Sequence, residues 1–200
     1  MNKKIGMIGS IINAITVFAF AICMLIDFKF GSYFVCIFLA LSFIMMIASF
    51  ENECNNDNKV AGKIASILSG VYVVLILIVY FTQCTSVMND KLSVEAFKVL
   101  DYSKMGLMFN LDLLGYGIMA LSTFFIGLTI NEKNKTDKIL KYLLLIHGIF
   151  FISCLIMPMT GIFANSDGSN SLGGIIALEI WCLYFFPIGI LSYLHFKKQV

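Results

Sequence analysis

The sequence predicts an all-α membrane protein, a single bundle of six transmembrane helices, and three observations support this. Hydrophobic residues make up 60% of the 200-residue chain, whereas charged residues make up only 13%. A soluble domain carries about 25% charged residues, so this chain could not cover its apolar surface in water. Six apolar runs, separated by short polar segments, reach the roughly 20 residues that a helix needs to cross a bilayer.

The six apolar runs predict the spans of one transmembrane domain over residues 1–200. The spans are expected at about residues 5–26, 31–50, 64–82, 107–130, 140–160 and 172–194. The first run follows a short basic start, and residues 19–21 resemble a signal-peptide cleavage site. Because this run continues through Ile26, it is long enough to span, and we expect an uncleaved first helix.

The connections between the spans carry turn and surface-helix patterns. Residues 27–30 predict a tight hairpin, and residues 163–171 predict a flexible polar loop. The longest loop, residues 83–104, has apolar residues at helical spacing on one face and charged residues on the other. This pattern suits a short amphipathic helix on the membrane surface or a capped extension of the fourth span.

Lysine placement predicts the orientation of the chain, which contains no arginine. Ten of the 14 lysines lie at the termini and in the second and fourth loops, and four lie on the opposite side. Because basic residues concentrate on the cytoplasmic side, we expect both termini in the cytoplasm and the protein in the cell membrane.

Two pairs of spans share a faint internal repeat. The tripeptide at residues 40–42 recurs at 120–122, and a lysine precedes a glycine by seven residues in the span that follows each copy. These pairs are Lys63 with Gly70 and Lys141 with Gly148. The pattern favours parallel hairpin repeats of spans 2–3 and 4–5, with chance similarity between apolar segments as the alternative.

Composition and motifs exclude several classes of function. A net charge of +2 gives no electrostatic footprint for nucleic acid. The six cysteines form no CxxC pair, which argues against a disulfide framework or a cysteine zinc site. The chain contains no Walker loop, HExxH motif or dinucleotide fingerprint. We therefore expect no metal and no cofactor, and the sequence argues against an enzyme.

Three ionisable residues within the apolar runs are the candidate ligand- or proton-binding residues, because a charge inside a bilayer is costly. Glu179 is expected about 10 Å below the outer surface. It precedes Pro187, which is expected to break the last span. A binding site in the bundle and a protonated structural glutamate both fit this pattern.

Asp112 and His147 each allow a functional and a structural interpretation. Asp112 lies at the outer interface or, if deeper, shares a small polar helix face with Gly115, Tyr116 and Thr123 that points at protein. His147 is a natural proton carrier, or a neutral histidine bonded to the backbone. Glu179 and His147 could be two stations of one proton path.

The segment at residues 111–117, followed by a span, a lysine-rich turn and His147-Gly148, resembles small six-span bacterial membrane proteins with no assigned activity. The resemblance covers the C-terminal half of the chain. It implies an architecture and no function.

We therefore expect a protein that binds or transports a small solute or ion within a six-helix bundle. The alternative is a membrane regulator, sensor or immunity-type protein that acts through helix contacts. An enzyme would require Asp112, His147 and Glu179 to converge. The expected partners are the lipid bilayer and a small solute or another protein, without nucleic acid, and the oligomeric state stays open.

Overall fold

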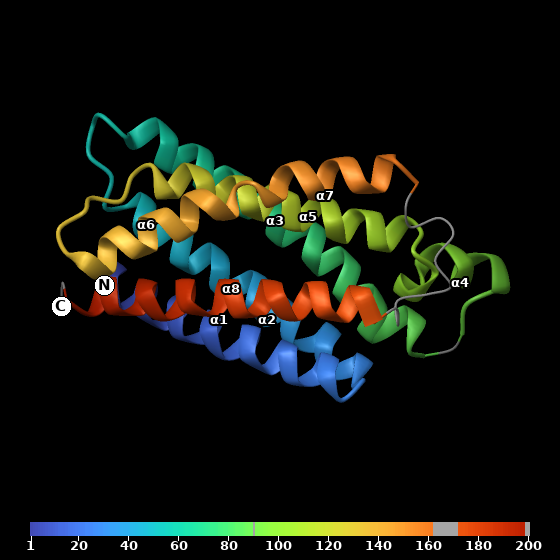
Figure 1. The fold of residues 1–200 in the computed structure, drawn as a ribbon. Helices are drawn as coiled ribbons and strands as arrows, with labels where there is room; N and C mark the ends of the chain where they lie inside the picture. Colours follow the sequence, from blue (N-terminus) through green and yellow to red (C-terminus); the bar gives the residue numbers. More distant parts are fainter. Residues whose placement is uncertain (90, 162–171, 199–200) are drawn as a thin grey trace.

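The computed structural model describes residues 1–89, 91–161 and 172–198, and over these residues the chain is helical without any strand. Six helical stretches of 21 to 29 residues are long and apolar enough to cross a membrane, which confirms the predicted all-α fold with six helices of spanning length (Figure 1). The α-helices are α1 (Asn2–Leu25), α2 (Lys29–Glu51), α3 (Lys59–Thr82), α4 (Val94–Leu100), α5 (Leu107–Gly127), α6 (Lys135–His147), α7 (Phe150–Met159) and α8 (Leu172–Lys197). A π-helical turn, η1 (Gln83–Val87), extends α3, and a 3-10 turn, η2 (Tyr102–Lys104), follows α4.

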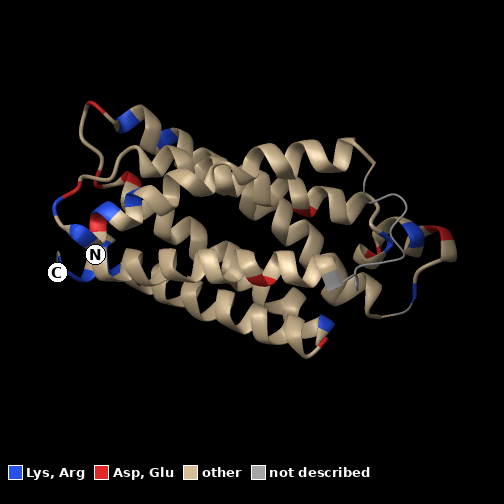
Figure 2. Ribbon diagram, in the orientation of Figure 1, with Lys and Arg blue, Asp and Glu red and all other residues tan. Residues whose placement is uncertain are grey.

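The long helices pack around the bundle in chain order. Helix α1 packs on α2 and α8, α3 packs on α2 and α5, α5 packs on α6 and α7, and α6 packs on α8. Both termini lie at one end of the bundle, here called the terminal end, and α4 lies at the opposite, loop end (Figure 1). Charged residues gather at these two ends, and few lie between them (Figure 2).

Local signals explain where several helices begin and end. The predicted hairpin after α1 is present, with Asp27 in the left-handed region at φ 52°. The side chain of Asn134 caps α6 by accepting a hydrogen bond from the Asp137 amide at 3.1 Å. Helix α4 is separate from α5, so its interpretation as an extension of the fourth span was wrong. The predicted polar loop at residues 163–171 lies outside the described residues.

The fifth span, and not the sixth, is interrupted. It consists of α6 and α7, which meet at residues 148–149, where a Cβ on Gly148 would lie 2.7 Å from the Cβ of Phe124. The break predicted at Pro187 was wrong, because α8 runs through this proline as one helix. A helix can pass a proline by giving up one backbone hydrogen bond.

Large aromatic side chains fill the middle of the bundle, and we call this group the aromatic core. The Phe43 ring lies 5.3 Å from the Tyr72 ring and 6.3 Å from the Phe185 ring. Trp181 stacks on Phe185 at 5.0 Å and meets Tyr116 edge-on at 5.3 Å. These rings come from α2, α3, α5 and α8, so they close the centre of the bundle at mid-depth.

Packing is uneven along the fifth and sixth spans. No residue of α7 is buried, and none of residues 173–180 of α8 is buried. By contrast, the rest of α8 buries Trp181, Phe185, Ile188 and Phe196. The closely packed parts of the fifth and sixth spans therefore lie toward the terminal end of the bundle.

Candidate functional site

Asp112 is the most buried carboxylate at the loop-end half of the bundle among the described residues. It lies in α5, five residues after the helix begins, and only 4% of its surface is exposed. Its Oδ2 accepts a hydrogen bond of 3.0 Å from the Tyr102 hydroxyl. Its Oδ1 is buried and has no hydrogen-bond partner among the described residues. A carboxylate has about four acceptor positions, so Asp112 is under-satisfied for a buried group.

The donor to Asp112 belongs to a segment that folds over the loop end of the bundle. We call residues 93–104 the lid; it contains α4 and η2. The fully buried Gln83 holds the lid with two hydrogen bonds. Its Nε2 donates to the Leu100 carbonyl at 2.8 Å, and its Oε1 accepts from the Tyr102 amide at 3.0 Å. Gln83 starts the π-helical turn, a local structure that often marks functional sites.

Three tyrosine rings from three elements surround this contact, and we call Tyr33, Tyr80 and Tyr102 the tyrosine cluster. Tyr33 lies 5.8 Å from both Tyr80 and Tyr102, and Tyr80 stacks on Tyr102 at 6.3 Å. Burial, followed by the negative charge of Asp112, holds the pKa of Tyr102 well above its usual range. The Tyr102 hydroxyl therefore keeps its proton and remains a donor to the carboxylate.

His147, the last residue of α6, is fully satisfied within the bundle. The indole Nε1 of Trp181 donates to its Nε2 at 3.2 Å, which leaves Nδ1 to carry the proton of a neutral ring. Nδ1 lies 2.7 Å from the Thr123 hydroxyl, which in turn donates to the Ala120 carbonyl at 2.7 Å. The histidine thus links three helices as a neutral side chain.

Glu179 lies in the loosely packed part of α8, with a partly exposed side chain. Its Oε1 is shielded from solvent and has no hydrogen-bond partner among the described residues. Trp181 follows two residues later and is therefore rotated by about 200° around the helix axis. Because Trp181 points at His147, Glu179 leaves α8 on a different side.

The structure does not bring the three predicted site residues together. Asp112 and Thr123, the partner of His147, lie eleven residues apart on α5, or about 16 Å along the axis. No hydrogen bond joins any two of Asp112, His147 and Glu179 in the described part of the chain. Asp112, Gly115 and Thr123 are buried, in agreement with the polar face predicted for a deep Asp112.

A cluster of three ionisable residues, His195, Asp137 and Glu53, lies at the terminal end, and we call it the clasp. His195 donates or accepts at both ring nitrogens: Nδ1 lies 2.8 Å from Asp137 Oδ1, and Nε2 lies 3.0 Å from Glu53 Oε2. His195 is 6% exposed and Asp137 is 2% exposed. The three residues come from α8, α6 and the turn after α2, so the clasp joins three distant segments.

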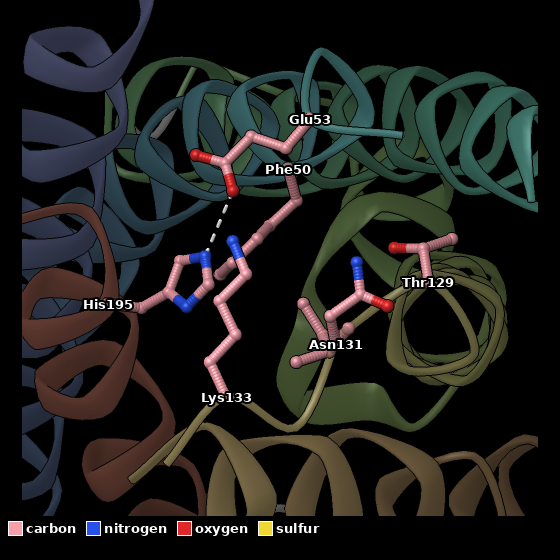
Figure 3. A pocket seen from close by; sticks show the side chains of 7 residues that line it. Phe50, Glu53, Thr129, Asn131, Lys133 and His195 are labelled. Carbon is pink, nitrogen blue, oxygen red and sulfur yellow. Dashed lines mark hydrogen bonds and ion pairs between the residues drawn. The ribbon is translucent and has the colours of Figure 1, made fainter. Parts of the chain in front are cut away.

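A small pocket of about 40 Å³ lies beside the clasp (Figure 3). Its walls include Thr129, Asn131 and Lys133 from the connection between α5 and α6, together with Glu53 and His195. Figure 3 shows the Lys133 side chain extending into the same pocket as the Glu53 carboxylate. The volume is sufficient for at least one water molecule.

Sequence reasoning missed Tyr102, Gln83 and all three clasp residues. His195 is one of only two histidines and lies in the last turn of an apolar run, a signal that could have marked it. Tyr102 and Gln83 carry no comparable signal, because their importance depends on how the lid folds back.

Neither site resembles a metal centre. Within residues 1–89, 91–161 and 172–198, no three His, Cys, Asp or Glu side chains are placed to hold a metal ion. In the clasp, the two carboxylates lie on opposite sides of the imidazole ring, so they cannot share one ion with it. Comparison with known proteins adds no further constraint, since no family model, no curated protein and no solved structure matches this chain.

Proposed function

We propose that the chain is an integral membrane protein with six transmembrane helices and both termini in the cytoplasm, and that it binds and transports an ion or small solute. The six long apolar helices and the charged residues at the two ends of the bundle support the membrane location. The lysine excess at the terminal end, ten against four, supports the orientation.

The observation that carries the transport proposal is the buried carboxylate of Asp112. An ionisable side chain inside the bilayer is expensive to keep, and such groups mark ion pathways and proton relays. Within the described residues, the Tyr102 hydroxyl donates to one oxygen of Asp112, and the other oxygen is buried without a hydrogen-bond partner. It therefore retains an unfilled acceptor position in the interior of the bundle.

The proton is the ion that best fits Asp112. Close-packed rings surround the carboxylate, with the tyrosine cluster on one side and Tyr116 one helical turn away on the same face of α5. A larger cation would have to displace these rings. A proton needs no added volume, and Asp112 can bind it where the side chain lies.

The predicted hairpin repeat would suit a transporter of this kind. The paired glycines lie in different surroundings: Gly148 contacts Phe124, whereas a Cβ on Gly70 would meet nothing within 4 Å. Duplication of spans 2–3 and 4–5 accordingly stays a prediction.

Proton flux into vesicles tests the proposal. The purified chain is reconstituted into liposomes that contain a pH-sensitive dye, and a potassium gradient with valinomycin supplies the driving potential. We expect wild-type vesicles to take up protons and Asp112→Asn to reduce the rate by about a hundredfold or more, the typical contribution of a group that transfers a proton.

A matched control separates this effect from a loss of charge. Asp27 is an exposed aspartate in the turn after α1, and asparagine also tolerates its left-handed backbone. Asp27→Asn should leave the flux unchanged. Wild-type vesicles as tight as empty liposomes, or equal fluxes from wild type and Asp112→Asn, would contradict the proposal.

The filled aromatic core favours a second candidate, a regulator that works through helix contacts. Its polar interior contacts include Asn13, whose Nδ2 donates to the Ser42 hydroxyl at 3.3 Å between α1 and α2. Such a protein would tolerate Asp112→Asn but not Asn13→Leu, because the larger side chain would separate the two helices. A transporter should show the greater loss with Asp112→Asn.

A further inference from the structure

The clasp offers an inference that is independent of proton transport. Two carboxylates approach the two nitrogens of one imidazole ring, at 2.8 Å and 3.0 Å. Ionised carboxylates only accept hydrogen bonds, and a neutral imidazole has a single N–H to donate. Both contacts can form together only when the ring carries two protons, so this geometry selects the imidazolium form of His195.

The two arms of the clasp differ in their exposure. The side chain of Asp137 is 4% exposed, whereas the side chain of Glu53 is 24% exposed. Asp137 is held further by the side chain of Asn134, whose Nδ2 donates to Asp137 Oδ2 at 2.7 Å. A neutral His195 would therefore donate its one N–H to the buried Asp137 and lose its hydrogen bond to Glu53.

The imidazole ring of His195 is fixed by packing, so loss of its hydrogen bond to Glu53 need not move the ring. His195 lies 5.2 Å from the Phe50 ring and 5.4 Å from the Phe196 ring. Phe196 in turn packs where Gly6 of α1 has no side chain, since a Cβ there would lie 2.8 Å from the ring.

The turn that carries Glu53, residues 52–58, is held at its ends, because Asn52 accepts a hydrogen bond from Asn2 at 2.9 Å and Asn58 donates one to the Thr129 carbonyl at 3.3 Å. Loss of the Glu53 contact therefore loosens the middle of this turn, around Glu53 and Cys54.

Other charged groups at the terminal end define the surroundings of His195. Lys133 extends into the pocket beside Glu53 and His195 (Figure 3). Lys198, which follows α8, donates to Asn134 at 3.2 Å, and Lys141 of α6 is paired with Glu132 at 3.1 Å. Lys3 and Lys4 of α1 belong to the same end of the bundle.

The pocket gives the clasp contact with solvent. It touches both His195 and Glu53 and has room for at least one water molecule. A proton can therefore leave His195 without separation of the helices. Lys133 lines the same pocket and offers Glu53 an alternative cationic partner once the imidazolium is lost.

We propose that His195, Glu53 and Asp137 form a pH-sensitive latch that holds the turn after α2 against the first turn of α6 and the last turn of α8. When His195 is protonated, Glu53 is bound and the turn is closed. When His195 loses its proton, its hydrogen bond to Asp137 stays, its contact with Glu53 opens, and the middle of the turn, around Glu53 and Cys54, loosens.

Histidine-specific NMR tests the protonation step in the unaltered chain. The chain has two histidines, so ¹⁵N-histidine labelling reports on His195 and His147 alone. The pH is varied from about 5.5 to about 8.5, around the ordinary imidazole value of about 6.5. We expect His195 to pass from two protonated nitrogens to one, while His147 keeps one throughout. A single protonated nitrogen on His195 at every pH would overturn the proposal.

Cysteine labelling tests loosening of the turn. Cys54 follows Glu53, and burial raises the pKa of its thiol. In full-length protein retaining Cys54 as the only cysteine, the maleimide reaction rate is measured with and without His195→Gln. The ratio of the two rates at each pH removes the common effect of thiol ionisation.

The expected result is a ratio that depends on pH. Near pH 5.5 the chain with His195 should react about tenfold more slowly than His195→Gln, the effect of one charged hydrogen bond. Near pH 8.5 the two rates should converge. Lys197→Gln, which alters a neighbouring exposed charge, should behave like the chain with His195 throughout. A ratio that stays constant with pH would contradict the latch.

Discussion

The two ends of the bundle each contain a buried carboxylate, but these carboxylates are satisfied in opposite ways. At the loop end, Asp112 accepts a hydrogen bond from the neutral Tyr102 hydroxyl, and its other oxygen has no partner in the part of the chain that the structure describes. At the terminal end, two carboxylates converge on His195. Among the described residues no salt bridge includes Asp112, whereas in the clasp two carboxylates face one imidazolium. The first arrangement favours uptake of a proton, and the second depends on keeping one.

The same substitution at both ends should therefore have unequal effects on stability. Asp137 accepts hydrogen bonds from both His195 and Asn134, and Asp137→Asn replaces one of its two acceptor oxygens with an amide donor. The imidazolium of His195 is then left with one carboxylate. Breaking a buried ion pair costs about 3–5 kcal/mol. Asp112→Asn removes a buried charge yet keeps an acceptor for Tyr102, so stability should stay within about 1 kcal/mol of wild type.

Thermal unfolding in one detergent measures this contrast. Lys141→Gln serves as a control, because it removes the exposed pair with Glu132 and should change stability by less than about 1 kcal/mol. Equal losses at Asp112 and Asp137 would show that the two carboxylates play equivalent structural roles.

The clasp at the terminal end should make the stability of the protein depend on pH. The folded chain holds the imidazolium of His195 between two carboxylates, and the unfolded chain does not. This contribution is present at acidic pH and is lost as the pH rises and the ring loses its proton. We expect the unfolding midpoint to fall between about pH 6 and about pH 8.5, by the equivalent of about 1–2 kcal/mol.

Variants locate the source of that pH dependence. His195→Gln should flatten the curve, because glutamine has no proton to lose in this range. Lys141→Gln, at an exposed pair, should leave the slope of the wild type intact. A wild-type midpoint that rises with pH would contradict the assigned direction.

The sequence predicted the helices well because their signal is local. Apolar runs of spanning length need no knowledge of neighbours, and six long apolar helices are present. The burial of Gly115 and Thr123 with Asp112 likewise followed from helical spacing. The interruption was misplaced at Pro187, since a proline can be accommodated within a helix, whereas Gly148 depends on the approach of Phe124 from α5.

The two polar sites were harder to predict because they form between distant residues. His195 and Glu53 are separated by 142 positions, and Gln83 and Tyr102 by 19. No period or motif connects such pairs. His147 shows the reverse case: an intramembrane histidine suggested proton transfer, yet Thr123 and Trp181 occupy both ring nitrogens.

A smaller effect is expected from loosening the lid at Gln83. Gln83→Leu keeps the volume of the side chain but removes the hydrogen bonds to Leu100 and Tyr102. Two partly buried backbone groups lose their partners, at a cost of about 1–2 kcal/mol. Hydrogen exchange at residues 94–104 should accelerate by at least about fivefold, while exchange in α6 stays unchanged.

Thr85→Val provides the matched control for the lid. Thr85 belongs to the same π-helical turn, but its hydroxyl donates to the Phe81 carbonyl at 2.6 Å and not to the lid. Its removal should leave exchange at residues 94–104 unaltered. Similar acceleration by both variants would assign the effect to the turn as a whole.

The smallest expected effect is the coupling between Tyr102 and Asp112. Tyr102→Phe removes one hydroxyl and keeps the ring against Tyr33 and Tyr80, so unfolding should change by about 1 kcal/mol. If the hydroxyl acts through the carboxylate, Tyr102→Phe and Asp112→Asn should be non-additive by about 0.5–1 kcal/mol in a double-mutant cycle. The same cycle with Asp27→Asn, at a distant turn, should be additive. If the effects of Tyr102→Phe and Asp112→Asn on unfolding also add, Tyr102 fixes the lid by packing alone. Its hydrogen bond to Asp112 would then not contribute to holding the lid.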